Sequence, residues 1–343
     1  MLLGATPTSG QAMERILALA VQGDGKIVVA GRVQNNTGSP LAAVGRLNTD
    51  GSWDTAFGDN GLFVLPYGVP SAPYGASLLT VGLMSDGSIL ASGGAYAGPG
   101  LFFPLDSCTL LLKLTGTGTL DTSFASDQSG SFCYDFASAN NMYEAHYDGI
   151  AIDSDDTWYL TSPSTNLAYG EVAHFDASGA LITSYGNSGI AALPYRVFGL
   201  QVQVQSDHPV LVDSVYTSSD GQGIAVSDVD LTGAINNQYG VVGSYAVDFQ
   251  TNGYPQVESA TLDGQGRLVV AENSFTGVDY LAYRFARATP AGIADASFNA
   301  MASNPDIRVL RSLSSRATPV QTILLRPRRS PTATFSPSAM PAR

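Results

Sequence analysis

The residues able to do acid–base or metal chemistry are few in this chain, and they do not recur in a pattern. The sequence contains three histidines, His146, His174 and His208, at unlike positions, which argues against a ring of metal ligands. No P-loop, dinucleotide-binding or zinc motif is present, and no Gly-x-Ser-x-Gly nucleophile motif. The sequence therefore predicts no catalytic residue, no metal site and no cofactor.

One acidic cluster comes nearest to a metal-binding pattern. It consists of Asp148, Asp153, Asp155 and Asp156. Calcium binds several oxygen ligands, but this spacing matches no EF-hand loop. Because three of the four fall where other parts of the chain place turn residues, solvated turn carboxylates are the favoured interpretation.

A glycan-cleaving enzyme is the catalytic alternative. Such an enzyme needs two carboxylates facing each other across the substrate. The candidates are Glu144 with either Glu272 or Asp279.

The two cysteines, Cys108 and Cys133, leave two interpretations open. They fall on strands expected to be neighbours, so they are either two buried thiols or a disulfide. A disulfide would imply an oxidising compartment.

The elements that must position these residues are hairpins of one repeated kind. Residues 21–30 form an apolar strand, the turn Gly23-Asp24-Gly25-Lys26 and a second apolar strand. Asp-Gly between two apolar runs is a strong hairpin signal. The same strand–turn–strand pattern recurs, less closely matched, at residues 83–91, 152–160, 204–212 and 262–271.

A second marker fixes the length of the repeat. Gly51-Ser52-Trp53-Asp54-Thr55-Ala56-Phe57 reappears at residues 118–124 and, more weakly, three further times. Its closing aromatics are spaced by 67, 61, 54 and 59 residues, and they are Phe57, Phe124, Tyr185, Tyr239 and Phe298. A period of this length with four strands per copy is typical of a β-propeller blade.

We therefore predict an all-β, propeller-like ring of five complete four-stranded blades, which is either the whole ring or part of a larger propeller. The repeat domain spans 13–311, with blades at about 13–70, 71–139, 140–196, 197–254 and 255–311. In the third blade the last strand is expected at 189–195, and a separate first strand of the fourth blade at 199–205. The fourth strand of the fifth blade is expected at 306–311.

These residues resemble a known family. The turn at 23–26, the strand Val44-Gly45-Arg46-Leu47-Asn48 and residues 50–58 are similar to the bacterial delta-60 repeat. The resemblance covers about residues 13–311 and is closest in the first two repeats. It implies a β-propeller-like fold in an exported or surface protein, and it supplies no catalytic residues.

The two ends depart from the repeat. Residues 1–12 are expected to be a remnant of a preceding repeat or a disordered leader. Residues 312–343 are expected to be a partial sixth repeat, beginning near Ile323, that runs into a disordered Arg/Pro-rich tail. A ring that lacks its closing blade exposes two blade faces, so we expect self-association.

The amino-acid composition argues against two kinds of binding partner, nucleic acid and the membrane interior. The net charge of −13 argues against a nucleic-acid partner. No apolar run is long enough for a membrane span, and no signal peptide is visible in this chain, so a secreted or cell-surface location rests on the resemblance alone.

The functional hypothesis rests on loops that differ in every repeat. These loops hold many aromatic side chains on one end of the ring, and exposed aromatics mark binding surfaces. The predicted ligand-binding residues are Tyr74, Tyr96, Phe102, Phe103, Tyr143, Tyr169, Phe198, Tyr216, Tyr254 and Phe275. We expect a non-catalytic module that binds an unknown glycan or protein ligand; the alternatives are a glycan-acting propeller enzyme and a purely architectural repeat of a larger surface protein.

Overall fold

The computed structural model describes most of the repeat domain. The residues described are 13–96, 106–136, 149–161, 169–217, 221–236, 239, 244–247, 254–275, 282–293, 295, 297–298, 307–311 and 321–325. Within them every regular element is a β-strand, as the alternating sequence pattern predicts. No helix in this part of the chain is long and apolar enough to cross a bilayer.

The first two blades are separate four-stranded antiparallel sheets, as predicted. Blade 1 has the order β1(Met13–Val21), β2(Ile27–Gln34), β3(Pro40–Leu47) and β4(Leu62–Val64). Blade 2 has the order β5(Ala76–Leu83), β6(Ile89–Tyr96), β7(Asp106–Leu114) and β8(Ser131–Tyr134). The hairpin turns need a positive φ, which Gly25 and Gly87 supply at 82° and 83°. The repeated Asp-Gly pair is therefore explained by the backbone conformation of the hairpin turn.

Blades 3 and 4 differ from the expectation because they share a strand. Their strands are β9(Ile150–Ile152), β10(Trp158–Thr161), β11(Tyr169–Phe175), β12(Ile190–Gln205), β13(His208–Thr217), β14(Gly221–Asp228) and β15(Ser244–Val247). The start of β12 pairs with β11 and its end pairs with β13, so the two blades form one seven-stranded sheet. The two strands expected at 189–195 and 199–205 are one continuous strand, since residues 196–198 keep an extended backbone.

Blade 5 differs at its outer edge. Its strands are β16(Tyr254–Leu262), β17(Leu268–Phe275), β18(Ala282–Ala288), β19(Ile307–Arg311) and β20(Gln321–Leu325). The expected fourth strand, β19, does not pair with β18. Instead β20 lies between them, and Ile323 pairs with both Phe285 and Val309. The segment expected to begin a sixth repeat thus lies in the fifth sheet.

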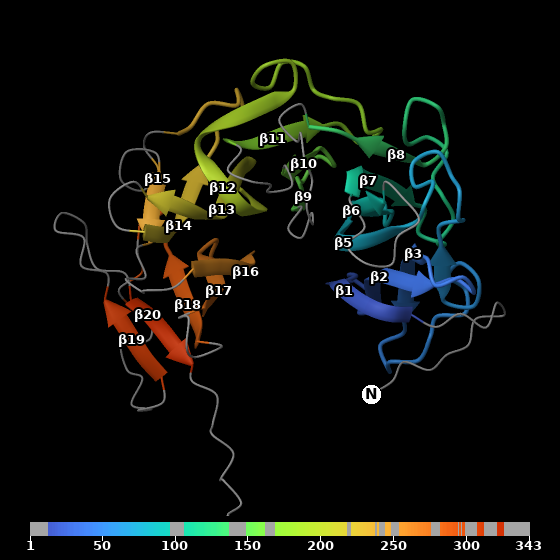
Figure 1. Ribbon diagram of the computed structural model, residues 1–343, viewed down its shortest axis with the longest axis horizontal. Helices are drawn as coiled ribbons and strands as arrows, with labels where there is room; N and C mark the ends of the chain where they lie inside the picture. Colours follow the sequence, from blue (N-terminus) through green and yellow to red (C-terminus); the bar gives the residue numbers. More distant parts are fainter. Residues whose placement is uncertain are drawn as a thin grey trace, which may run out of the picture.

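The five blades follow one another around a ring, with their first strands nearest the centre (Figure 1). Successive blades pack face to face through apolar side chains. Between blades 1 and 2, for example, Val28, Ala30, Leu78 and Leu112 are fully buried in one cluster. Burying a valine or leucine side chain contributes about 1.5–3 kcal/mol, so neighbour contacts stabilise the array. Figure 1 also shows an opening, across which blade 1 and blade 5 face each other.

Candidate functional site

The repeated aspartates build turns. In blade 1, Asp50 Oδ1 accepts hydrogen bonds from the backbone N of Ser52 at 2.9 Å and from its hydroxyl at 2.6 Å. These bonds lower the pKa of Asp50, since they favour the ionised carboxyl. The same arrangement with a following Ser or Thr recurs at Asp121, Asp155, Asp176, Asp230 and Asp295.

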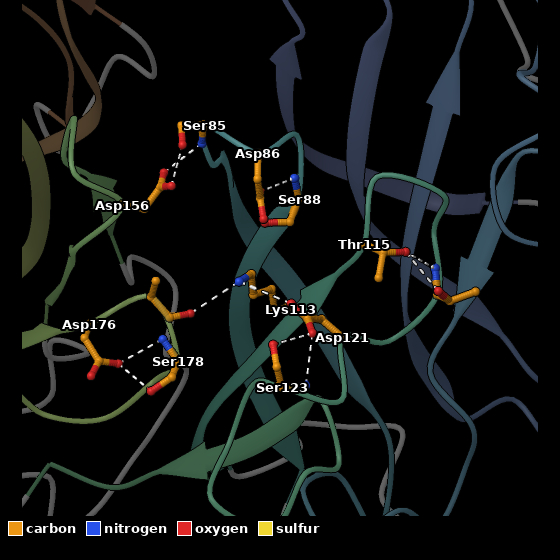
Figure 2. A network of polar contacts seen from close by, with 12 residues as sticks. Ser85, Asp86, Ser88, Lys113, Thr115, Asp121, Ser123, Asp156, Asp176 and Ser178 are labelled. Atoms are coloured by element: carbon orange, nitrogen blue, oxygen red, sulfur yellow. Dashed lines mark hydrogen bonds and ion pairs between the residues drawn. The ribbon is translucent and has the colours of Figure 1, made fainter.

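The acidic cluster considered for calcium is used in the same way. Asp155 Oδ1 accepts from the Thr157 backbone N at 2.9 Å and hydroxyl at 2.7 Å. Asp156 accepts at Oδ1 from the Ser85 backbone N and at Oδ2 from its hydroxyl, which joins blade 3 to blade 2 (Figure 2). Asp148 lies outside the described residues. No group of three His, Cys, Asp or Glu side chains in the described ranges could hold a metal ion.

A second repeated device is an ion pair that also reaches the next blade. In blade 1, Asp54 Oδ2 accepts from Arg46 Nε at 2.8 Å and Lys26 Nζ at 2.9 Å, and Arg46 Nη1 donates to the Gly116 carbonyl of blade 2 at 2.6 Å. The Lys26 and Arg46 bonds hold the pKa of Asp54 below its usual value, with Lys26 the larger cause.

Blade 2 repeats this arrangement with a lysine. Lys113 Nζ lies 3.2 Å from Asp121 Oδ2 and donates to the Ala177 carbonyl of blade 3 at 3.3 Å. Figure 2 shows Lys113 beside Asp121, with a second dashed line running towards the loop that carries Asp176 and Ser178. In blade 5, Arg287 Nε and Asp295 Oδ2 form the equivalent pair at 2.7 Å.

The histidines serve packing and turns. The ring of His174 stacks on Tyr159 with centroids 4.1 Å apart and meets Tyr185 edge-on at 5.1 Å. Burial lowers the pKa of His174, so the imidazole is neutral at pH 7. His208 lies at a hairpin turn with Nδ1 3.7 Å from Asp228 Oδ1, and His146 lies outside the described residues.

The predicted aromatic surface is described only in part. Tyr74 is 39% exposed, and Tyr67, on the same link between blades, is 48% exposed. Tyr96 is only 7% exposed, and its hydroxyl lies 2.8 Å from Ser77 Oγ, so its side chain packs inside blade 2. Tyr169, Phe198, Tyr216, Tyr254 and Phe275 are placed by their strands alone. Phe102, Phe103 and Tyr143 lie outside the described residues.

The carboxylates considered for catalysis fall largely outside the described residues. Glu144 and Asp279 lie outside the described ranges. Glu272 is placed only by its position in β17.

The structure forms a groove between blades 2 and 3. Its volume is about 540 Å³. It is lined by Ser123, Ala125, Ser126, Asp127, Phe132, Cys133, Tyr134, Phe175, Ser178, Gly179, Ala180 and Leu181. A second hollow of about 280 Å³ lies between blades 1 and 2 and shares Asp127, Phe132 and Cys133 with it.

Aromatic contacts give the groove a firm wall. Tyr134 meets Phe175 edge-on with centroids 5.1 Å apart, and Phe132 lies 6.3 Å from the same ring. Phe175 in turn stacks on Trp158 at 4.2 Å, and Trp158 Nε1 donates to the Asp176 carbonyl at 2.8 Å. These rings are fixed by their neighbours before any ligand arrives, which lowers the entropy lost on binding.

Two titratable groups line this groove. Burial, with a smaller effect of Glu171, raises the pKa of Tyr134 to about 12, so its hydroxyl stays protonated. The Ser129 hydroxyl and backbone N lower the pKa of Asp127, so its carboxyl stays ionised. The groove thus offers apolar rings, a neutral hydroxyl and one fixed negative charge.

A disulfide between Cys108 and Cys133 joins β7 to β8 beside the groove. Cys133 lines both hollows. Closing a loop of this length stabilises a domain by about 3 kcal/mol. The disulfide therefore holds the strand that separates the two hollows.

Apart from Cys133, the groove residues are not among those predicted from the sequence, although a signal was present. Phe132 and Tyr134 alternate along β8, which places their side chains on one side of it, and Phe136 follows two residues later. Tyr134 and Phe136 meet edge-on at 4.9 Å. Three aromatics at alternate positions, along and just after a blade's last strand, point to an aromatic wall at the junction with the next blade.

Comparison with known proteins gives limited similarity. A family model described as "Domain of unknown function (DUF5122) beta-propeller" matches residues 22–57. No curated protein matches the sequence.

Several solved structures are similar in outline. A protein of unknown function from Bacteroides caccae is 11% identical, with 82% of this chain and 80% of that chain covered and a TM-score of 0.44. Polysaccharide lyase Uly1 is 10% identical, with 82% and 71% covered and a TM-score of 0.43. A GH43 endo-arabinanase from Bacillus licheniformis is 11% identical, with 80% and 95% covered and a TM-score of 0.34. At these values the propeller assignment rests on the strand topology itself.

Proposed function

We propose that this chain is a non-catalytic repeat domain of an exported or surface-associated bacterial protein, and that it binds a glycan or protein ligand on surfaces held by its rigid blades. The groove between blades 2 and 3 carries the proposal. Its wall of Phe132, Tyr134 and Phe175 suits stacking against an apolar face of a ligand. The exposed hydroxyls of Ser123, Ser126 and Ser178 around it suit hydrogen bonding.

The charge state of the lining supports binding rather than acid–base catalysis. A glycan-cleaving acid needs a carboxyl whose pKa is raised, so that it holds a proton near neutral pH. Asp127 has its pKa lowered, as do the turn aspartates Asp50, Asp121 and Asp176. These carboxylates are acceptors that hold turns.

The variable loop face is the second proposed surface. Tyr67 and Tyr74 are exposed on the link between blades 1 and 2, and such aromatics are frequent in binding sites. An exported location agrees with the disulfide, because disulfides persist in oxidising compartments.

The test is a binding screen of the intact chain on a glycan array and against extracellular proteins. Ser126→Trp fills the groove from an exposed position and should abolish binding without changing the melting temperature. Thr55→Trp, at an exposed site of blade 1, is the matched control and should bind normally. Tyr67→Ser with Tyr74→Ser tests the loop face in the same screen.

Two results would overturn the proposal. Turnover of a glycan, lost in Glu144→Gln, would make the chain an enzyme. Absence of any ligand for the intact chain would favour an architectural repeat.

A further inference from the structure

The first strand of blade 1 exposes a surface that is packed in the other blades. Leu19 and Val21 are 65% and 60% exposed, and the nearby Leu17 is 41% exposed. The positions equivalent to Leu19 are Val81, Ile150, Val202 and Ala260, and none of them is exposed. Val202 and Ala260 are only 1% and 7% exposed. The apolar residues therefore recur in every blade, but only in blade 1 are they not packed against a neighbouring blade.

In the other blades, the first strand of the preceding blade packs against these apolar residues. Gly82 in β5 lies so close to β9 that a Cβ atom on it would stand 2.6 Å from Ile152 Cδ1. Gly149, preceding β9, lies likewise against Val202 of β12 at 3.1 Å. Small residues of one blade therefore pack on branched residues of the next. Val202 is equivalent to Leu19, and Ile152 is equivalent to Val21. A blade packed on β1 in the same register would therefore place its equivalent of Gly149 against Leu19 and its equivalent of Gly82 against Val21.

Blade 5 leaves the complementary face open. Its residues at these two positions are Ser259 and Thr261, which are small and exposed. Its closing aromatic, Phe298, is half-buried, whereas Phe57, Phe124 and Tyr185 of other blades are buried by the blade that follows. Arg287 lies over the Phe298 ring at 4.6 Å, as Arg46 lies over Phe57. Blade 5 thus has the features that elsewhere meet a next blade.

We propose that blade 5 of one molecule packs on strand β1 of a second molecule, so that copies associate head to tail. The interface continues the blade-to-blade packing already present four times in the chain. Blades 1 and 5 of one molecule lie apart across the opening in Figure 1, which leaves each face to a second copy. This inference is independent of the groove and goes beyond the proposed function.

The contact joins two unlike faces, and this determines which kind of oligomer forms. An interface of this heterologous kind leaves one free face of each type on every open assembly, so assemblies grow by addition until they close into a ring. Thr261 should lie against Val21 of the partner copy, and Ser259 against Leu19. The Arg287 guanidinium should reach a turn carbonyl of the partner copy, as Arg46 reaches Gly116.

Light scattering coupled to size exclusion tests this with two blocked variants. Leu19→Lys with Val21→Lys spoils the β1 face, and Thr261→Lys spoils the blade 5 face, each at exposed positions. Wild type should form concentration-dependent oligomers, and each variant alone should be monomeric. A mixture of the two variants retains one good face of each kind and should give a dimer that grows no further.

The control variant is Leu231→Lys, which removes an equally exposed apolar residue from a turn of blade 4 and should oligomerise like wild type. A monomeric wild type, or a mixture of the blocked variants that stays monomeric, would overturn the proposal. Ligand binding in the groove would be unaffected by either result.

A cysteine pair decides between two copies and one closed ring. Val21→Cys with Thr261→Cys should cross-link between molecules on oxidation and give a ladder of multimers. A cross-link formed only within one molecule would overturn the head-to-tail arrangement. Failure of any new cross-link to form would do the same.

Discussion

Blades 1, 2 and 5 differ from blades 3 and 4 at one repeated pair of positions. In the first group a cation on the third strand pairs with an aspartate eight residues later, as in Arg46–Asp54, Lys113–Asp121 and Arg287–Asp295. In blade 3 the same two positions hold His174 and Ile182, and in blade 4 Asp228 and Asn236.

The backbone is the same in both groups. In all five blades the residue at the aspartate position donates its backbone N to the carbonyl of the third-strand residue at 2.9 Å. In blade 3 the side-chain space is filled by the stack of His174 on Tyr159. In blade 4, Asn236 Nδ2 donates to Asp228 Oδ2 at 2.6 Å. The repeat thus requires that the space at this site is filled, and an ion pair is one of several ways to fill it.

The largest effect is expected where the charges are most buried. Asp54→Ala should lower the free energy of unfolding by about 3–5 kcal/mol, because it leaves Arg46 buried without its carboxylate. Urea unfolding measures the loss. Asp50→Ala, in an exposed turn of the same blade, is the control and should cost far less. Equal losses in the two variants would mean that the ion pair has no special role.

Moving the ion pair into blade 3 sharpens the comparison. His174→Arg alone should destabilise by about 2 kcal/mol, because a guanidinium would enter the space beside Tyr159 and Tyr185 with no carboxylate. Adding Ile182→Asp should recover about 1 kcal/mol of that loss through the new pair. A double-mutant cycle by urea unfolding gives the coupling. Strictly additive losses would contradict the idea that the site accepts either solution.

The buried histidine gives blade 3 a pH dependence of its own. Burial lowers the pKa of His174 below its usual 6.5, so below pH 6.5 the unfolded chain gains a proton that the folded chain does not. Stability should therefore fall as pH drops below 6.5 towards the lowered value, by at most about 1.4 kcal/mol per pH unit. Melting temperatures between pH 7 and 5 measure this.

His174→Phe is the matched control, since it keeps a ring beside Tyr159 and cannot titrate. Its melting temperature should change less with pH across the same range. The aspartates whose pKa values are lowered act in a separate window, because their contribution is lost as pH falls through their usual 3.8 and below. An identical slope in wild type and variant would exclude His174 as the source.

The smallest effect is expected at the hairpin turn of blade 3. Asp156 adopts a φ of 65°, where blades 1 and 2 have Gly25 and Gly87. Asp156→Gly relieves that conformation but loses the bonds to Ser85, so the two effects should cancel to within about 0.5 kcal/mol. Asp156→Val should cost about 1–2 kcal/mol, because a β-branched residue strongly disfavours this φ. Thermal unfolding of both variants tests the contrast, and equal stability of the two would refute it.

Most of the fold could be predicted from the sequence because turn chemistry and strand alternation are local. Asp24-Gly25 and Asp86-Gly87 fix hairpins, and the alternation of Leu19 and Val21 fixes which side of a strand is apolar. The partner of a strand is not local. Nothing in residues 321–325 says that they pair with β18, and nothing near residue 196 forces a break between two blades.

The site was less predictable for the same reason. Exposed aromatics on variable loops are visible in a sequence, but burial is not, and Tyr96 is packed inside blade 2. The groove is formed by two blades whose residues are far apart in the chain, such as Tyr134 and Phe175. The alternation of Phe132, Tyr134 and Phe136 shows that a wall exists, while its depth depends on how blade 3 packs against it.

The continuous strand β12 bears on how such a chain gains or loses copies of its repeat. The border between the first two copies falls in residues 65–75, between two sheets, so a duplication or deletion ending there leaves both ladders whole. The border near residue 196 falls inside β12, which pairs with β11 on one side and β13 on the other. An unequal crossover there would cut a strand that two blades share. We therefore expect blades 3 and 4 to be gained or lost together, as a unit twice as long as the repeat.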